Sequence, residues 1–523
     1  MNLIKNHLLR TLLVVAAVLS LHSCSCSGPK SMEGKLDKVS DKAQLIVTVN
    51  VEKLFEQLDI TVSDKGTIEL PTYLTQFFNA VGGNRKELRR ITEFSGIDYT
   101  QAVIAGYDLD DNQNPFVMMI FNITDKDDFI KSVKEADDNA QTRDSDGYTV
   151  ISTSDGYGPK LLIKDNLAYM VSDNVSAKDL SQRLEAAKDL PLAEWKKKYL
   201  SDDNSEVAVL LTGDILDNIP APLLSSFTAG IDIDPMTASF GFKGTLSGPT
   251  ASINGAYLDK DGNPAKLKFT KNIDTALLKY INPKDLAVSA TGISSLEHLK
   301  TLIARMGIQG MPDEMQASLD KILSFKDLSL VFAAGPLTDK SFMEWNDPTA
   351  EIRLTVALSG SEADMKDLYN FVCEFMDLST NEFTNGQTPR LGSPAKNYPD
   401  QYTVRVKTNE RYNWETDEYE YNYMNIYAQR NGNSIVFSNA PVTDKGNTNF
   451  TAAEFGDKTA MFKIILPKDL PNLGGIKLPN GFVLTGWGGD TAAGNIELSI
   501  TGTQEKIIPA IVDMAMTFGS GGM

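Results

Sequence analysis

Short runs of alternating apolar and polar residues occur along most of the chain, and this is the pattern of half-buried β-strands. Residues 42–49 and 116–123, rich in β-branched and aromatic residues, are two of the predicted strands, and Asx-Gly turns such as Asp146-Gly147 separate several of the strands. Helical spacing is rarer and occurs at 177–187 and 193–199. Because strands outnumber helices and do not alternate with them one for one, the pattern predicts an α+β fold. We expect a mostly antiparallel sheet with helices packed on one face.

The same order of elements occurs twice along the chain. The strand over 42–49 and the helix over 51–58 have counterparts from Lys284 onward, 242 positions later. The other matches, in order, are 116–133 with 352–369, 148–150 with 402–404, 161–173 with 426–439, 206–209 with 458–461, and 240–244 with 482–486. The last match is again 242 positions apart, and a return to the starting offset is what a duplication predicts. We expect two tandem α+β domains, 37–270 and 271–523.

The start of the chain has the pattern of an exported protein. A basic segment precedes an uncharged apolar run over 11–21, which is shorter than the roughly 20 residues needed to span a bilayer. The run ends in Leu21-His22-Ser23-Cys24, which resembles the lipobox of bacterial lipoproteins. That resemblance implies a signal peptide over 1–23, a lipidated Cys24 and a tether over 24–36. Several acyl chains on Cys24 would form a stable membrane anchor. The alternatives are a secreted protein that is cut near Ser23 and carries no lipid, and a transmembrane segment at the start of the chain.

The charge of the chain excludes one class of partner. The formal net charge is −19, and loss of Lys5 and Arg10 with the signal peptide lowers it to −21. A surface of that charge repels phosphate backbones and anionic headgroups. We therefore expect no nucleic-acid binding, and we expect the lipid to hold the protein at its membrane.

Few side chains suited to bond-making chemistry remain after processing. His7 and His22 leave with the signal peptide, so a Ser-His-Asp or Cys-His site would have to use His298. A helix is expected to start at Ser294 or Ser295, and His298 falls off its apolar stripe, which predicts a solvated surface side chain. We expect a protein without enzymatic activity, cofactor or metal. A carboxylate-dependent hydrolase is a weaker alternative, because 69 acidic residues always offer some pair.

The cysteines exclude a disulfide framework. Lipidation uses Cys24, which leaves Cys26 in the tether and Cys373 on an expected helix. One His and two distant thiols are too few for a zinc site of the usual kind. A bridge between Cys26 in the tether and Cys373 on the expected helix is the less favoured alternative.

Two acidic loops have a partial calcium-binding pattern. Residues 108–114 begin D-x-D-x-N, but Gln113 and Met119 stand where an EF-hand needs Gly and Glu. The loop over 259–263 fails at the same two positions, with Pro264 and Thr270. Because 108–114 joins two apolar runs, we interpret it as a hairpin turn.

An aromatic segment is the best candidate for contact with a ligand or partner. Its residues are Tyr412, Trp414, Tyr419, Tyr421, Tyr423 and Tyr427. The four tyrosines from 419 on share parity, so on a strand they point to one face. Tyrosine can stack on sugar rings or anchor a partner protein. In the alternative interpretation, these rings pack the hairpin against its own sheet.

The lipobox at Leu21–Cys24, the opening Val39-Ser40-Asp41-Lys42 before a Val/Ile strand, and the duplicated layout together resemble one family. It is a family of uncharacterised lipoproteins from Bacteroides-like bacteria that carry a domain of unknown function, and it supplies no catalytic residues. The resemblance implies a cell-envelope location, with the anchor in the outer membrane. Because 25–30 holds no acid, it favours a periplasm-facing anchor over a surface-exposed one. We expect a binding or scaffolding role for an envelope protein, with glycan binding in nutrient uptake as the alternative.

Overall fold

The computed structural model describes residues 30–520. The exceptions are 64–66, 81–87, 90–91, 110–114, 154–157, 203, 213–237, 297–312, 337–351, 381–390, 393–396, 469–479 and 504. Nineteen strands of the described part form one sheet, and every pairing within it is antiparallel. The prediction of an α+β fold with an antiparallel sheet is therefore confirmed.

The pairings place the strands in one continuous order. From one edge the first ten are β6 (Ala140–Ser145), β7 (Tyr148–Thr153), β8 (Lys160–Lys164), β9 (Leu167–Val171), β5 (Pro115–Asn122), β4 (Val103–Leu109), β1 (Leu45–Val49), β10 (Val207–Thr212), β11 (Ser239–Ser247) and β12 (Thr250–Leu258). The other nine follow as β21 (Ala493–Thr501), β20 (Gly481–Gly488), β19 (Ala460–Leu466), β13 (Ala287–Ser295), β14 (Lys326–Pro336), β15 (Ile352–Ser359), β18 (Ser434–Ser438), β17 (Glu418–Asn431) and β16 (Gln401–Asn413). A separate pair is β2 (Thr61–Val62) with β3 (Ile68–Glu69).

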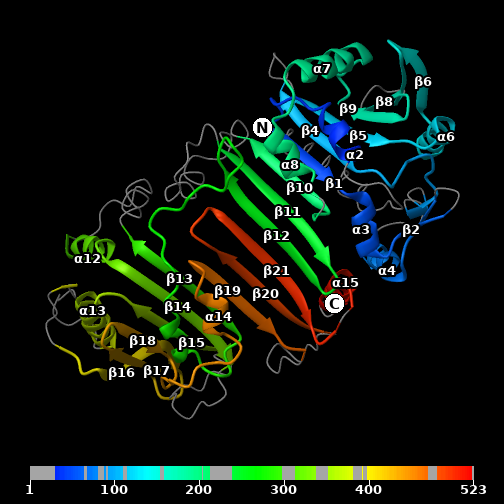
Figure 1. Cartoon of the computed structure of the whole chain (residues 1–523). Helices are drawn as coiled ribbons and strands as arrows, with labels where there is room; N and C mark the ends of the chain where they lie inside the picture. The colour runs from blue at the N-terminus through cyan, green and yellow to red at the C-terminus, as the bar shows by residue number, and fades with distance from the viewer. Residues whose placement is uncertain are drawn as a thin grey trace.

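Strand β12 pairs with β21 and joins the two halves of the chain (Figure 1). We call this pairing the seam. The expectation of one sheet for each copy is wrong in this respect, because the two sets of strands continue into each other. The physical reason is that an unpaired sheet edge exposes a row of N–H and C=O groups, and pairing of two such edges satisfies both.

Helices cover both faces of the sheet, so the expectation of one covered face is wrong. One face carries α3 (Val51–Leu58), α4 (Thr72–Ala80), α6 (Lys126–Ala136), α12 (Asp313–Leu323), α13 (Glu362–Thr380) and α15 (Ile507–Ser520). The other carries α2 (Lys30–Leu36), α7 (Ala177–Asp189), α8 (Glu194–Leu200), the 3-10 helix η1 (Thr275–Tyr280) and α14 (Ala452–Phe455). We call them the α3 face and the α8 face. Among the described residues, no helix is long and apolar enough to cross a bilayer.

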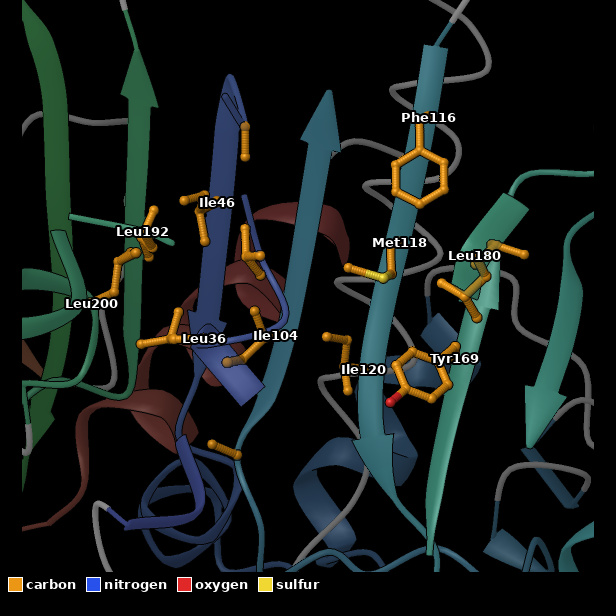
Figure 2. Close-up of a cluster of buried hydrophobic side chains, with 14 of the residues drawn as sticks. Leu36, Ile46, Ile104, Phe116, Met118, Ile120, Tyr169, Leu180, Leu192 and Leu200 are labelled. Atoms are coloured by element: carbon orange, nitrogen blue, oxygen red, sulfur yellow. The ribbon is translucent and has the colours of Figure 1, made fainter. Parts of the chain in front are cut away.

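Strand β5 explains why both faces need helices. Met118 and Ile120 pack into the cluster under α2, α7 and α8, as Figure 2 shows. Met119 and Phe121, at the alternate positions, pack into the cluster under α3 and α6. Because this strand is apolar on both sides, a single helical layer would leave half of its side chains in water.

Local signals account for the ends of several elements. Helix α7 begins with a capping box in which Ser176 and Asp179 each accept a hydrogen bond from the other's backbone N–H. The turn between β6 and β7 has a positive φ at both Asp146 and Gly147, as a two-residue hairpin turn requires. Helix α3 spans Val51–Leu58 as predicted, and the Asn50 side chain caps its first turn.

Strand β13 continues through Ser295, which lies opposite Lys326 of β14. The helix predicted to start at Ser294 or Ser295 would run through residues 297–312, which lie outside the described residues, as does His298. An N-cap residue has extended backbone angles, so the strand end at Ser295 leaves that prediction open.

Lys35 of α2 makes the stability of this fold depend on pH. Its side chain is 3% exposed, and its Nζ donates a 2.6 Å hydrogen bond to the Ala102 carbonyl. Burial lowers the pKa of Lys35 from 10.5 to about 8, and the nearby Asp98 offsets part of this effect. The unfolded chain therefore binds more protons than the folded chain between pH 8 and 10.5, so Lys35 adds stability as the pH rises through that window.

We expect the Lys35→Met variant to lose this dependence. Urea unfolding at pH 7.5 and pH 10 measures the free energy of unfolding of the wild type and of the variant at each pH. The wild type should gain roughly 2–3 kcal/mol relative to the variant between the two pH values. The reading of Lys35 as a buried amine would be wrong if the two proteins followed parallel pH profiles.

Candidate functional site

Strands β12 and β21 alternate between apolar and polar side chains where they meet at the seam. On β12, Ile253 points to the α3 face and Asn254 to the α8 face, and on β21, Ile496 and Asn495 do the same. Ile253 lies directly opposite Ile496 in the pairing, and they are 54% and 48% exposed. The described helices flank these strands on the α3 face, with α15 at one end (Figure 1). The middle of the sheet thus presents an apolar surface to solvent.

A groove of about 690 Å³ follows this apolar surface across the seam. Phe240, Phe242, Ile253, Phe462 and Ile496 supply its large side chains. Its floor contains Gly255, Gly486, Gly488 and Gly494, which carry no side chain. The Phe462 ring lies in the space that a Cβ on Gly486 would take. We call it the apolar groove. Sequence reasoning missed it, although the alternation along 250–258 and 493–501 was visible.

The aromatic segment forms a ribbon of two strands, β16 and β17, at the edge of the sheet. At its tip the ring of Tyr412 lies 4.8 Å from the ring of Trp414 and 5.0 Å from that of Tyr419. The Tyr412 hydroxyl donates to Asp417. Trp414 is 87% exposed and Tyr419 54% exposed. We call these three residues the aromatic tip, and they present ring surface to solvent.

The other tyrosines of the segment lie further along β17. The guanidinium of Arg405 lies 3.9 Å from the centre of the Tyr423 ring. Tyr427 pairs with Ser438, which places it on the α8 face, away from α13. The backbone of Tyr421 pairs with Glu410, and its side chain lies outside the described residues.

Asp108 and Asp259, one from each acidic loop, form interactions within the fold. Asp108 forms an ion pair of 3.6 Å with Arg183, and β4 and β5 form a hairpin around 110–114, which lies outside the described residues. Asp259 accepts from the backbone N–H of Asp261 and of Asn263, both at 2.9 Å. Hydrogen bonds from these donors lower the pKa of Asp259. In the described part of the chain, no group of three or more His, Cys, Asp or Glu side chains is arranged to hold a metal ion.

Cys373 is fully buried on α13, in the cluster that packs this helix on the sheet. A disulfide between Cys373 and Cys26 would require the buried thiol of Cys373 to reach the surface. Cys24 and Cys26 lie outside the described residues.

Comparisons with known proteins leave the family open. No family model matches the chain, and no curated protein matches it. Among solved structures, crystal form I of TP0453 is similar to 44% of this chain and 79% of that chain, at 10% sequence identity and a TM-score of 0.27. A similarity of that size carries no argument about function.

Proposed function

We propose that this protein is a non-enzymatic cell-envelope lipoprotein, anchored through Cys24, that binds an aliphatic ligand such as an acyl chain in the apolar groove. The observation that carries this proposal is the exposed apolar surface at the seam. Large exposed apolar patches on globular proteins usually mark binding surfaces, because they are unfavourable in water. Ile253 and Ile496, both about half exposed, lie at the centre of this one.

The lining of the groove favours an aliphatic ligand over a sugar or an extended peptide. Its side-chain hydrogen-bonding groups on the α3 face are the hydroxyls of Ser289 and Thr291 at one side. A sugar or a peptide placed there would lose its hydrogen bonds to water without replacement, which costs several kcal/mol per group. A chain of methylene groups has no such cost. It also fits a floor of glycines between the rings of Phe242 and Phe462.

We also propose that the two halves are copies of one domain. Outward from the seam, the first half runs β12, β11, β10, β1, β4, β5, β9, β8, β7, and the second half runs β21, β20, β19, β13, β14, β15, β18, β17, β16. Seven strands of the second half, all except β21 and β14, occupy the places that the sequence matches assign to their counterparts. The groove would then lie on an approximate two-fold axis through Ile253 and Ile496.

The envelope location rests on the sequence of the N-terminus. With the lipobox, a net charge of −21 after processing and the opening of the first domain, we propose membership of the uncharacterised Bacteroides-type lipoprotein family. In that setting the anchor lies in the outer membrane and faces the periplasm. A membrane nearby is also a source of acyl chains.

A fluorescent fatty acid, dansylaminoundecanoic acid, tests the proposed function on the full mature chain. We expect saturable binding with a blue-shifted emission, because the dye leaves water. The double variant Ile253→Lys, Ile496→Lys should bind at least about tenfold more weakly, since two charged ends then enter the groove. The matched control is Ile352→Lys, because Ile352 is 60% exposed on β15 and does not line the groove. Equal affinity of all three proteins, or no saturable binding to the wild type, would refute the proposal.

A second candidate function is glycan binding at the aromatic tip. The observation that favours it is the exposure of Trp414, which is 87% exposed and whose ring stands nearly perpendicular to that of Tyr412. The double variant Trp414→Ala, Tyr419→Ala should then lose binding to oligosaccharides while the fluorescent fatty acid still binds.

A further inference from the structure

The opposite face of the seam carries a second hollow, of about 600 Å³, whose lining differs in chemistry from the apolar groove. It lies on the α8 face, behind strands β11, β12, β21 and β20. One row of side chains crosses it in register: Lys243 on β11, Asn254 on β12, Asn495 on β21 and Trp487 on β20. Neighbouring strands in a sheet are about 4.8 Å apart, so this row extends over roughly 15 Å. We call this site the polar hollow.

Its two amides are not used within the described part of the fold, and the amide of Asn254 is open to a ligand. Asn254 is exposed, and Asn495 lies opposite it across the seam. Neither amide has a hydrogen bond to another described side chain or backbone group, and the Oδ1 of Asn495 is buried without a partner. A buried amide oxygen without a partner is unfavourable, and an Asn can donate two hydrogen bonds and accept through its oxygen. A ligand with hydroxyl groups would use these groups from both halves of the chain.

The charged groups of the hollow are already paired. Lys243 forms a 2.6 Å ion pair with Asp202, and Lys458 forms one of 2.6 Å with Asp457. An anionic ligand such as a phosphate would have to displace a carboxylate from each lysine. The hollow is therefore suited to a neutral ligand that accepts hydrogen bonds without carrying charge.

Trp487 supplies a flat aromatic wall. Its side chain packs against the buried cluster under η1 and α14 and also lines the hollow. Across the row, Tyr199 packs closely on the backbone of Gly241, with the Lys243 ammonium 4.3 Å from the centre of its ring. A rigid indole beside two unused amides is the combination that holds a pyranose ring, because the C–H face of the sugar stacks on the ring while its hydroxyls bond to the amides.

From this arrangement we infer that the polar hollow is a binding site for a neutral sugar, stacked on Trp487 and held by Asn254 and Asn495. This inference does not rest on the aliphatic ligand, since the side chains that distinguish the two sites point to opposite faces of the sheet. Both hollows share the strand residues Gly255, Trp487, Gly488, Gly494 and Asn495. It is also independent of the aromatic tip, which lies on the edge ribbon of β16 and β17. One thin layer of central strands would then carry an apolar ligand on one face and a sugar on the other.

Calorimetric titration of the mature chain with maltotriose, cellotriose and chitotriose, taken separately, tests this inference. We expect saturable binding of at least one trisaccharide. Asn254→Ala should weaken it about tenfold or more, which corresponds to about 1.4 kcal/mol, because it removes the hydrogen bonds of one amide. Asn254 is exposed, so this change should leave the fold intact. Trp487→Ala should abolish binding but also removes packing, and circular dichroism before and after heating checks whether it still folds.

The controls separate this site from the others. Phe375→Ala removes an aromatic side chain of α13 that is 56% exposed and lies outside all three sites, so it should leave the titration unchanged. A loss of binding in Trp414→Ala with none in Asn254→Ala would instead place the sugar at the aromatic tip. The Ile253→Lys, Ile496→Lys variant should lose binding of the fluorescent fatty acid and retain binding of the sugar. Asn254→Ala should retain binding of the fatty acid and lose affinity for the sugar. The inference is overturned if no trisaccharide binds at concentrations up to about 10 mM. That limit is about ten times weaker than a Kd of roughly 1 mM, which corresponds to a binding free energy of −4.1 kcal/mol. The inference is equally overturned if Asn254→Ala binds as tightly as the wild type.

Discussion

Replacing Cys24 by Ser is expected to move the whole protein from the membrane fraction to the aqueous phase. The reason is that every acyl chain of the proposed anchor depends on this one sulfur, whose thioether the variant cannot form. Each buried methylene group contributes about 0.8 kcal/mol to membrane binding, so loss of several chains removes essentially all of it. The mature side chains, at −21, are repelled by anionic headgroups and give no compensating attraction.

Detergent phase partition with Triton X-114 and metabolic labelling with palmitate measure this change. Cys26→Ser is the matched control, because it removes a thiol two positions away and leaves the lipobox intact. The control should stay in the detergent phase and take up label. If Cys24→Ser also partitions into detergent and takes up label, the protein is not anchored through this residue.

Replacing Arg353 by Met is expected to cost about 3–5 kcal/mol of stability, because it leaves a buried carboxylate without its counter-charge. Arg353 on β15 and Asp285, just before β13, are 5% and 1% exposed, and their NH2 and Oδ2 atoms lie 3.3 Å apart. The Asp285 oxygen also accepts from the backbone N–H of Asn282 at 2.9 Å. Gly335 makes this contact possible, since a Cβ at that position would collide with Asp285.

The loss should depend on pH in a defined direction. Burial raises the pKa of Asp285, and the positive charge of Arg353 opposes that rise. Without Arg353 the folded-state pKa of Asp285 rises further above its unfolded value. The folded variant then binds the proton more tightly than the unfolded chain, so its stability recovers as the pH falls and declines as the pH rises.

Urea unfolding followed by tryptophan fluorescence at pH 7.5 and pH 5 measures both effects. Trp487 packs on the neighbouring cluster and should report this half of the sheet. The double variant Asp285→Leu, Arg353→Met should be more stable than Arg353→Met alone, since it removes both charges. A loss below about 1 kcal/mol for Arg353→Met, or a loss that does not change with pH, would show that the pair is not buried as described.

The three candidate sites differ in how far the sequence predicted them. The parity of the tyrosines and the hairpin that carries them could be derived from the chain alone, because hairpin partners are close in sequence. The pairing of Asn254 with Asn495, or of Ile253 with Ile496, joins residues that lie more than 240 positions apart. No local signal specifies such a partner, so neither the apolar groove nor the polar hollow was predictable as a site.

What the sequence determined by itself was local. It determined the strands and helices where apolar periodicity, capping residues and Asx-Gly turns agree, as at α3, α7 and the turn at Asp146-Gly147. The tertiary structure alone decided that two edges meet at β12 and β21, and that the central strands face solvent while β5 is covered on both sides. The physical reason is that alternation specifies which side chains share a face. Whether a helix covers that face depends on contacts between segments that are distant in the chain.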